Sequence, residues 1–273
     1  MPPPRRLTQT LMLGVINKAF PVRVWKAGGA FETLVQTILS QNTNDRNSEA
    51  AMRKLRKHYK ITPRTLAKTR ASRLIPYIRQ AGLYRSKAPR IIETSRIIDE
   101  RYGGSLTKVL DQPYKQAKEE LMTLPGVGPK TADILLAFVA KNPVIPIDTH
   151  IARVTKRLGI ARSKANYEEI RTSLEALIPP RDRVRDHLSI IAFGRAICKA
   201  PRPRCSICPV NKSCPSSIVR HEINRIPRQQ LFLVNGHSHG DGSLLADRSN
   251  KRRHTLLCRS YSGRKDNYTR RDS

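Results

Sequence analysis

The chain has 273 residues, enough for one large domain or two small ones with a substantial core. It holds 52 Lys and Arg residues against 21 Asp and Glu, a formal net charge of +31, and no apolar run as long as a membrane span. Residues 216–273 contain 12 basic and 5 acidic residues, so most of the positive surplus belongs to residues 1–215. The lack of such a run argues against a membrane protein, and the N-terminus MPPPRRL lacks the apolar segment of a secretory signal. We expect an intracellular protein, in the cytoplasm or nucleoid if prokaryotic, that is attracted to nucleic acid.

The first part of the chain shows helical periodicity and almost no strand-like alternation. Residues 7–20 and residues 31–39 each place apolar side chains at helical intervals. These side chains are Leu7, Leu11, Val15, Ile16 and Phe20 in the first segment, and Phe31, Leu34, Val35, Ile38 and Leu39 in the second. A polar cluster at 40–45 follows, which predicts a loop and the cap of the next helix.

Further helices are expected between this loop and residue 122, separated by short polar or glycine-containing turns. Their ranges are 46–58, 64–69, 71–80, 86–101 and 113–122. One of the turns, Gly82-Leu83-Tyr84-Arg85-Ser86-Lys87, places a leucine where it would be exposed, unless it packs two helices together.

A glycine-rich turn, Leu124-Pro125-Gly126-Val127-Gly128, separates the helix ending near 122 from an apolar run at 134–139. Glycine permits positive φ and leaves the backbone N–H groups accessible. Pro129 suits the first position of a helix. The pattern predicts a helix, a hairpin and a second helix whose N-terminus can bind a phosphate oxygen, or else a hairpin with no ligand.

Lys130 falls in the first turn of that second helix, where the positive end of the helix dipole disfavours its ammonium form. A neutral amine there could attack an electrophilic sugar carbon. Asp148 precedes a helix expected at 150–158 and could return to the hairpin as its catalytic partner. The alternatives are that Lys130 only contacts phosphate and that Asp148 only caps its helix.

Two more helices are expected at 166–177 and 184–197, and four cysteines follow them. Cys198, Cys205, Cys208 and Cys214 have the spacing C-x6-C-x2-C-x5-C. Disulfides are rare inside cells, so the pattern indicates a metal centre. Zinc sites usually show two close pairs of ligands, whereas four thiolates also suit a [4Fe-4S] cluster.

The tail, residues 216–273, is polar and basic and lacks periodicity, so we expect it to be largely disordered. Cys258 is expected to be a free thiol. His237, His239 and Asp241 are expected to be solvated rather than to bind a metal.

LPGVGPKTA followed by PIDTH resembles the helix-hairpin-helix and Gly/Pro-Asp motifs of the DNA glycosylase superfamily, and specifically its endonuclease III branch. The 82–87 turn and the cysteine spacing resemble the same branch, and the likeness extends over residues 7–215. It implies an all-α protein with a cleft between two lobes. One lobe comprises 1–30 and 143–215 with an iron–sulfur loop, and the other comprises 31–142 with the hairpin.

The resemblance also implies residue roles. Lys130 would be the amine nucleophile and Asp148 the second catalytic residue, while Gly126, Val127 and Gly128 would bind the DNA backbone. Leu83 would wedge into the duplex, and either Gln41 or Asn42 would fill the gap left by an extruded base. The four cysteines would hold a [4Fe-4S] cluster, which favours iron–sulfur over zinc.

The expected function is therefore base excision repair by a bifunctional DNA glycosylase and AP lyase. It would act, as a monomer, on double-stranded DNA with oxidised pyrimidines or abasic sites. Relatives that excise mismatched thymine or adenine typically place serine or tyrosine where this chain has Lys130, which favours the bifunctional enzyme. Two alternatives stay open: a monofunctional mismatch glycosylase, and a non-catalytic iron–sulfur protein that binds DNA.

Overall fold

The computed structural model describes residues 5–24 and 28–218, all within one compact unit. Every regular element in these residues is helical, which confirms the all-α prediction. The α-helices are α1 (Arg5–Ala19), α2 (Ala30–Ser40), α3 (Asp45–His58), α4 (Pro63–Ala67), α5 (Ala71–Ile78), α6 (Tyr84–Tyr102), α7 (Thr107–Leu110), α8 (Tyr114–Met122), α9 (Pro129–Ile134), α10 (Thr149–Arg157), α11 (Tyr167–Glu175) and α12 (Arg183–Ala196). None of the described helices combines the length and the hydrophobicity that crossing a bilayer requires.

The expected helices are all found, most with ends within two residues of the predicted ones. The elements that were not predicted are short: α7 and the 3-10 turns Pro180–Asp182 and Cys205–Ile207. Four residues or fewer are too few for an apolar period to emerge, which is why periodicity did not predict them. A further 3-10 turn, Arg79–Ala81, overlaps the end of the helix predicted at 71–80. The apolar run after the hairpin continues α9 as the π-helical turn η2 (Leu135–Val139).

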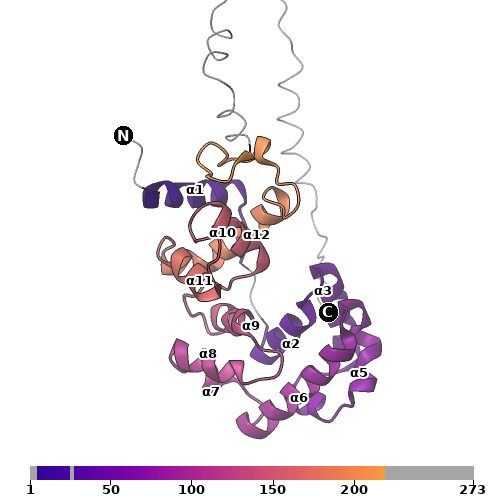
Figure 1. The fold of residues 1–273 in the computed structure, drawn as a ribbon. Helices are drawn as coiled ribbons and strands as arrows, with labels where there is room; N and C mark the ends of the chain where they lie inside the picture. Colours follow the sequence, from indigo (N-terminus) through magenta and orange to yellow (C-terminus); the bar gives the residue numbers. More distant parts are fainter. Residues whose placement is uncertain (1–4, 25–27, 219–273) are drawn as a thin grey trace, which may run out of the picture. The chain divides into compact units, whose positions relative to one another are not determined.

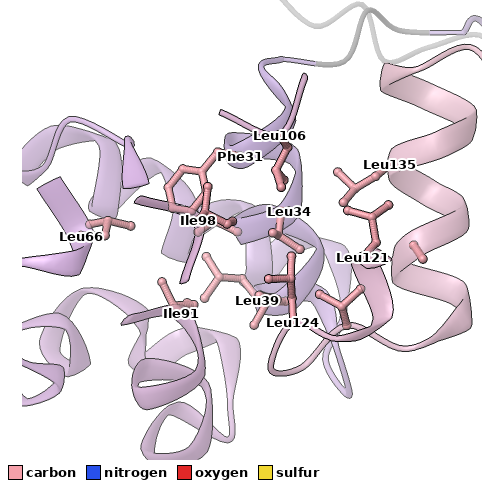
Figure 2. Close-up of a cluster of buried hydrophobic side chains, with 14 of the residues drawn as sticks. Phe31, Leu34, Leu39, Leu66, Ile91, Ile98, Leu106, Leu121, Leu124 and Leu135 are labelled. Carbon is pink, nitrogen blue, oxygen red and sulfur yellow. The ribbon is translucent and has the colours of Figure 1, made fainter. Parts of the chain in front are cut away.

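One hydrophobic cluster gathers side chains from α2 to η2 around the predicted stripe of α2. Phe31, Leu34, Val35, Ile38 and Leu39 are all buried, as their spacing predicts. Figure 2 shows α2 side chains meeting others from α6, α8 and η2 in this cluster. Full burial of a leucine or isoleucine stabilises the fold by roughly 1.5–3 kcal/mol. This packing holds the hairpin between α8 and α9 against α2.

A second hydrophobic cluster gathers α1, the segment before α10, and α10 to α12. Helix α1 lies beside α12, and α10 packs on both α11 and α12 (Figure 1). The buried face of α1 consists of Met12, Leu13 and Ile16. The helix was correctly predicted, but Leu7, Leu11 and Val15 of its apolar pattern are exposed. The first helix of the chain thus packs with its last helices.

Most of the tail predictions lie outside the described residues, which end at 218. This applies to residues 219–273 and to the predictions for His237, His239, Asp241 and Cys258.

Candidate active-site cleft

A cleft of about 790 Å³ opens between α2 and α3 on one side and α12 on the other, with α9 and the residue before α10 also lining it. Both Lys130 and Asp148 line this cleft. Its volume lies within the range of sites that enclose a small ligand, roughly 300–1,000 Å³. The two residues singled out from the sequence therefore border the same space, which is large enough for a nucleoside.

The hairpin is a tight turn in which Gly126 has φ +82°, a left-handed conformation that favours glycine. A Cβ at Gly126 would also meet Cδ of Arg90 at 3.3 Å. Gly128 is the N-cap of α9, Pro129 is its first residue, and the exposed Lys130 follows in the first turn. The helix start therefore has the form that its glycines and proline predict.

Side chains from other helices hold the turn in place. Thr94 Oγ1 donates to the carbonyl oxygen of Pro125 at 2.8 Å, and Gln41 Nε2 donates to that of Gly126 at 2.8 Å. Within the turn, the N–H of Val127 donates to the carbonyl oxygen of Leu124 at 3.1 Å. The Val127 amide is thus engaged, whereas the amides of Gly126 and Gly128 have no protein acceptor among the described residues.

Asp148 is the N-cap of α10, and its Oδ1 accepts the N–H of Ile151 at 2.7 Å. The capping interpretation of this residue is therefore correct, and it does not conflict with a catalytic one. The cap engages Oδ1, and the same carboxylate carries a second oxygen, Oδ2, and the negative charge. Asparagine would preserve the cap without that charge.

The segment that leads into Asp148 is buried and irregular, so side chains satisfy its backbone groups. Glu175 Oε1 accepts the N–H of Ile145 at 3.0 Å, and the Tyr167 hydroxyl accepts that of Ile147 at 3.2 Å. His187 Nδ1 lies 2.9 Å from the carbonyl oxygen of Pro146. Residues of α11 and α12 thereby determine where Asp148, the N-cap of α10, lies.

His187, which the sequence did not single out, also lines the cleft. The carbonyl oxygen of Pro146 can only accept, so Nδ1 carries the proton and Nε2 keeps its lone pair. Burial lowers the pKa of His187 to about 4; Lys130 adds to this lowering, while Asp148 opposes it. The imidazole is therefore neutral at physiological pH. The residues around His187 come from other elements, so the sequence near His187 does not predict its role.

The folded-state pKa of His187, about 4, lies below the unfolded value of 6.5. The unfolded chain thus takes up a proton first, and stability is lost as the pH falls from 6.5 toward 4. We expect His187 to account for about 2 kcal/mol of lost unfolding free energy between about pH 7 and about pH 5. In urea titrations at both pH values, His187→Gln should lose less stability on acidification than the unmodified protein. Equal losses in both proteins would contradict this assignment.

Two ion pairs border the cleft. Arg56 Nε lies 2.6 Å from Glu32 Oε1, and Arg195 Nη1 lies 2.6 Å from Asp45 Oδ2. The second pair joins α12 to the first residue of α3, across the opening between them. Since both of its side chains are about half exposed, it contributes little stability.

Two loops predicted to touch DNA are held by one buried lysine. Lys87 is 1% exposed, and its Nζ donates to the carbonyl oxygens of Leu39 at 2.7 Å and Ala81 at 2.8 Å. Burial lowers the pKa of Lys87 to about 8. It thereby joins the end of α2, before Gln41 and Asn42, to the turn that carries Leu83.

The side chains on these loops differ in whether they are exposed and free of protein contacts, and so in whether they could contact DNA. Leu83 is 56% exposed and has φ +48°, while Asn42 is exposed with φ +51°. The side chain of Gln41 is instead bound to the hairpin carbonyl of Gly126.

The four predicted cysteines are unpaired and together line one small cavity, whose other walls include Leu158, Phe193 and Val210. Arg157 of α10 donates to the sulfur of Cys198 at 3.4 Å and to the carbonyl oxygen of Lys199 at 2.7 Å. In the described part of the chain, no three His, Cys, Asp or Glu side chains form a group that could hold a single metal ion. The cysteine loop is thus anchored on the helix that Asp148 caps.

The described residues form an all-helical fold with a glycine hairpin, and a lysine and an aspartate line one cleft. These features are those of a class of helical proteins that bind a phosphate backbone and place an amine near it. The model of the HhH-GPD superfamily of base excision DNA repair proteins matches residues 35–180. Endonuclease III of Thermotoga maritima is 41% identical over 199 residues, covering 73% of this chain and 88% of that protein. Endonuclease III of Bacillus subtilis is 36% identical over 184 residues, covering 67% of this chain and 80% of that protein.

A solved structure of a trapped endonuclease III–DNA covalent intermediate is similar in fold, with a TM-score of 0.70 and 31% sequence identity. The similarity covers 79% of this chain and 98% of that one. The chain belongs to the HhH-GPD superfamily of base excision DNA repair proteins and, within it, to the endonuclease III-like members. The family predicted from the sequence motifs is confirmed.

Proposed function

We propose that this protein is a bifunctional DNA glycosylase and AP lyase that uses Lys130 as its nucleophile and Asp148 as its partner. The observation that carries this proposal is that Lys130, in the first turn of α9, and Asp148, the N-cap of α10, line one cleft of about 790 Å³. The similarity to an endonuclease III that was trapped covalently on DNA supports the same chemistry.

Lys130 attacks C1′ of the damaged nucleotide once that nucleotide has rotated out of the duplex into the cleft. The C1′–N bond breaks, and the base leaves with the bonding electrons and takes up a proton. The amine loses its protons as the sugar ring opens, which gives an imine between Nζ and C1′. Removal of a C2′ proton then expels the 3′ phosphate, so the strand breaks by β-elimination.

Asp148 accepts a proton from Lys130 and stabilises the positive charge that develops on the sugar. The cap to Ile151 supports this role because it restrains the carboxylate through Oδ1 only, one of its two oxygens. The neutral His187 adds no competing cation beside Lys130.

The DNA backbone binds at the hairpin, where the amides of Gly126 and Gly128 donate to a phosphate oxygen. Val127 supports the conformation of the hairpin through its buried side chain. Its N–H does not bind the phosphate, because it donates to the carbonyl oxygen of Leu124. Leu83 wedges into the duplex, in keeping with its exposure. Asn42 fills the gap opposite, because the amide of Gln41 is already bound to the hairpin.

The substrate is double-stranded DNA that contains an oxidised pyrimidine or an abasic site, and the protein acts on it as a monomer. We also propose that residues 1–30 and 143–215 form one lobe and residues 31–142 the other. Two separate hydrophobic clusters support that division, because their buried members fall into these two groups of residues, except for Val144.

The four cysteines are proposed to hold a [4Fe-4S] cluster. The residues fit this group: four unpaired thiols line one otherwise largely apolar cavity, and the Arg157 guanidinium donates to one sulfur. The cluster would brace the basic 198–214 loop on α10. No catalytic step is assigned to it.

Anaerobically purified protein should therefore contain about four irons and four inorganic sulfides per chain. Cys214→Ser should lose most of that iron, because it removes one of the four ligands. Cys258→Ser, which changes the fifth cysteine of the sequence, should retain it. Stoichiometric zinc in place of iron would contradict the proposed cluster.

The proposed activity is tested with a duplex oligonucleotide that carries one thymine glycol. The bifunctional enzyme should release the base and also nick the strand without added alkali. A monofunctional mismatch glycosylase would nick no strand before alkali is added, and a non-catalytic DNA-binding protein would release no base. Either of these results would overturn the proposal.

A further inference from the structure

The helix that carries Lys130 also carries a buried carboxylate that the mechanism does not use. Asp133 lies three residues after Lys130 in α9 and is 0% exposed. Its Oδ1 accepts the hydroxyl proton of Tyr114 at 2.9 Å. Its Oδ2 accepts from the Tyr167 hydroxyl at 2.6 Å and from Lys118 Nζ at 3.0 Å. A buried carboxylate is tolerated only with such partners, so these contacts determine where α9 lies.

The three donors come from different parts of the fold. Tyr114 and Lys118 lie on α8, and Tyr114 packs against the same hydrophobic cluster as α9. Tyr167 is the first residue of α11 and packs against the second cluster. Lys118 also reaches α11, through the exposed Glu168, but that contact does not extend to the segment before Asp148.

Tyr167 continues the connection to that segment. Its hydroxyl donates to Asp133 and at the same time accepts the N–H of Ile147, the residue before Asp148, at 3.2 Å. Burial, followed by the Asp133 carboxylate, raises the pKa of Tyr167, so the phenol keeps the proton that it donates. Ile147 is itself buried, and its N–H would otherwise lack a partner.

Glu175 and His187 also hold this segment, at Ile145 and Pro146. In the described residues neither of them makes a hydrogen bond to α9. We infer that Tyr167 is a positioning residue, which fixes the Asp148 carboxylate relative to the Lys130 amine by hydrogen bonding to Asp133 and Ile147 together. The inference rests on the proposed function, because it concerns how those two groups are held.

A shift of Asp148 relative to Lys130 would slow the chemistry more than it weakens DNA binding. Misplacement of reacting groups by about 1 Å can cost on the order of 100-fold in rate. Tyr167 neither lines the cleft nor belongs to the proposed DNA contacts, so its hydroxyl should not affect affinity.

The test compares Tyr167→Phe with Tyr114→Phe. Each variant removes one hydroxyl from Asp133, but only the first also releases the N–H of Ile147. In Tyr167→Phe the ring, whose centroid lies 5.1 Å from Lys118 Nζ, remains to fill its place. Three quantities are measured: the single-turnover rate of strand cleavage, the Kd for a duplex with an uncleavable abasic analogue, and the hydrogen-exchange rate of the Ile147 amide.

We expect Tyr167→Phe to cleave about 10- to 100-fold more slowly, with Kd changed by less than about twofold. The Ile147 amide should exchange faster in this variant alone, and Tyr114→Phe should cleave at close to the unmodified rate. Equal rates in the two variants, or a loss of affinity in place of rate, would overturn the inference while leaving the proposed function intact. An unmodified protein that cleaves no DNA would instead overturn the proposed function, and the inference with it.

Discussion

Lys130→Ala should abolish the covalent cross-link that forms when borohydride reduces the imine on thymine glycol DNA. Without the amine no bond to C1′ can form, so strand cleavage should fall by on the order of 10³-fold or more. The side chain is exposed in the first turn of α9, so its removal should change the unfolding free energy by no more than about 0.5 kcal/mol.

The matched control is Lys115→Ala. Lys115 is also an exposed helical lysine, in α8, and it does not line the cleft. This variant loses the same charge and should cross-link like the unmodified protein. Undiminished cross-linking by Lys130→Ala would refute the assignment of the nucleophile.

Asp148→Asn should slow base release by about 10²- to 10⁴-fold while leaving the fold and DNA affinity nearly unchanged. Asparagine caps a helix as well as aspartate does, so the contact with Ile151 N–H can persist without the negative charge. The measurement is the single-turnover rate of base release, together with the Kd for an uncleavable duplex and the thermal midpoint.

Asp148→Ala supplies the comparison, since it removes both the charge and the cap. It should release base as slowly as Asp148→Asn does, and its unfolding free energy should also fall by about 1 kcal/mol because the cap is lost. If Asp148→Asn released base as fast as the unmodified protein, Asp148 would have only its capping role. That outcome would favour a DNA-binding protein without catalytic function.

Local patterns predicted the helices and the hairpin because the forces that shape them act over a few residues. The stripe of α2 repeats at helical spacing and is buried on that face, and Gly126 has the positive φ that glycine allows. The buried face of α1 was less predictable, because its apolar residues lie on more than one side and only packing on α12 selects Met12, Leu13 and Ile16.

The parts of the site that depend on distant partners could not be predicted. His187 is neutral because it is buried, and the Pro146 carbonyl only fixes which ring nitrogen carries the proton. Tyr167 connects α9 to the segment before Asp148. Neither residue stands in a motif, and each acquires its partners only when separate helices pack. The proposal of Asn42 over Gln41 likewise rests on the contact between Gln41 and the hairpin, which joins residues far apart in the sequence.

The location of the reduced sugar adduct tests the central proposal most directly. After borohydride treatment of the unmodified protein on thymine glycol DNA, the cross-linked chain is digested and the modified peptide is sequenced by mass spectrometry. The sugar remnant should be attached to Nζ of Lys130. A remnant on any other amine, or no adduct from an enzyme that still nicks the strand, would contradict the proposed mechanism.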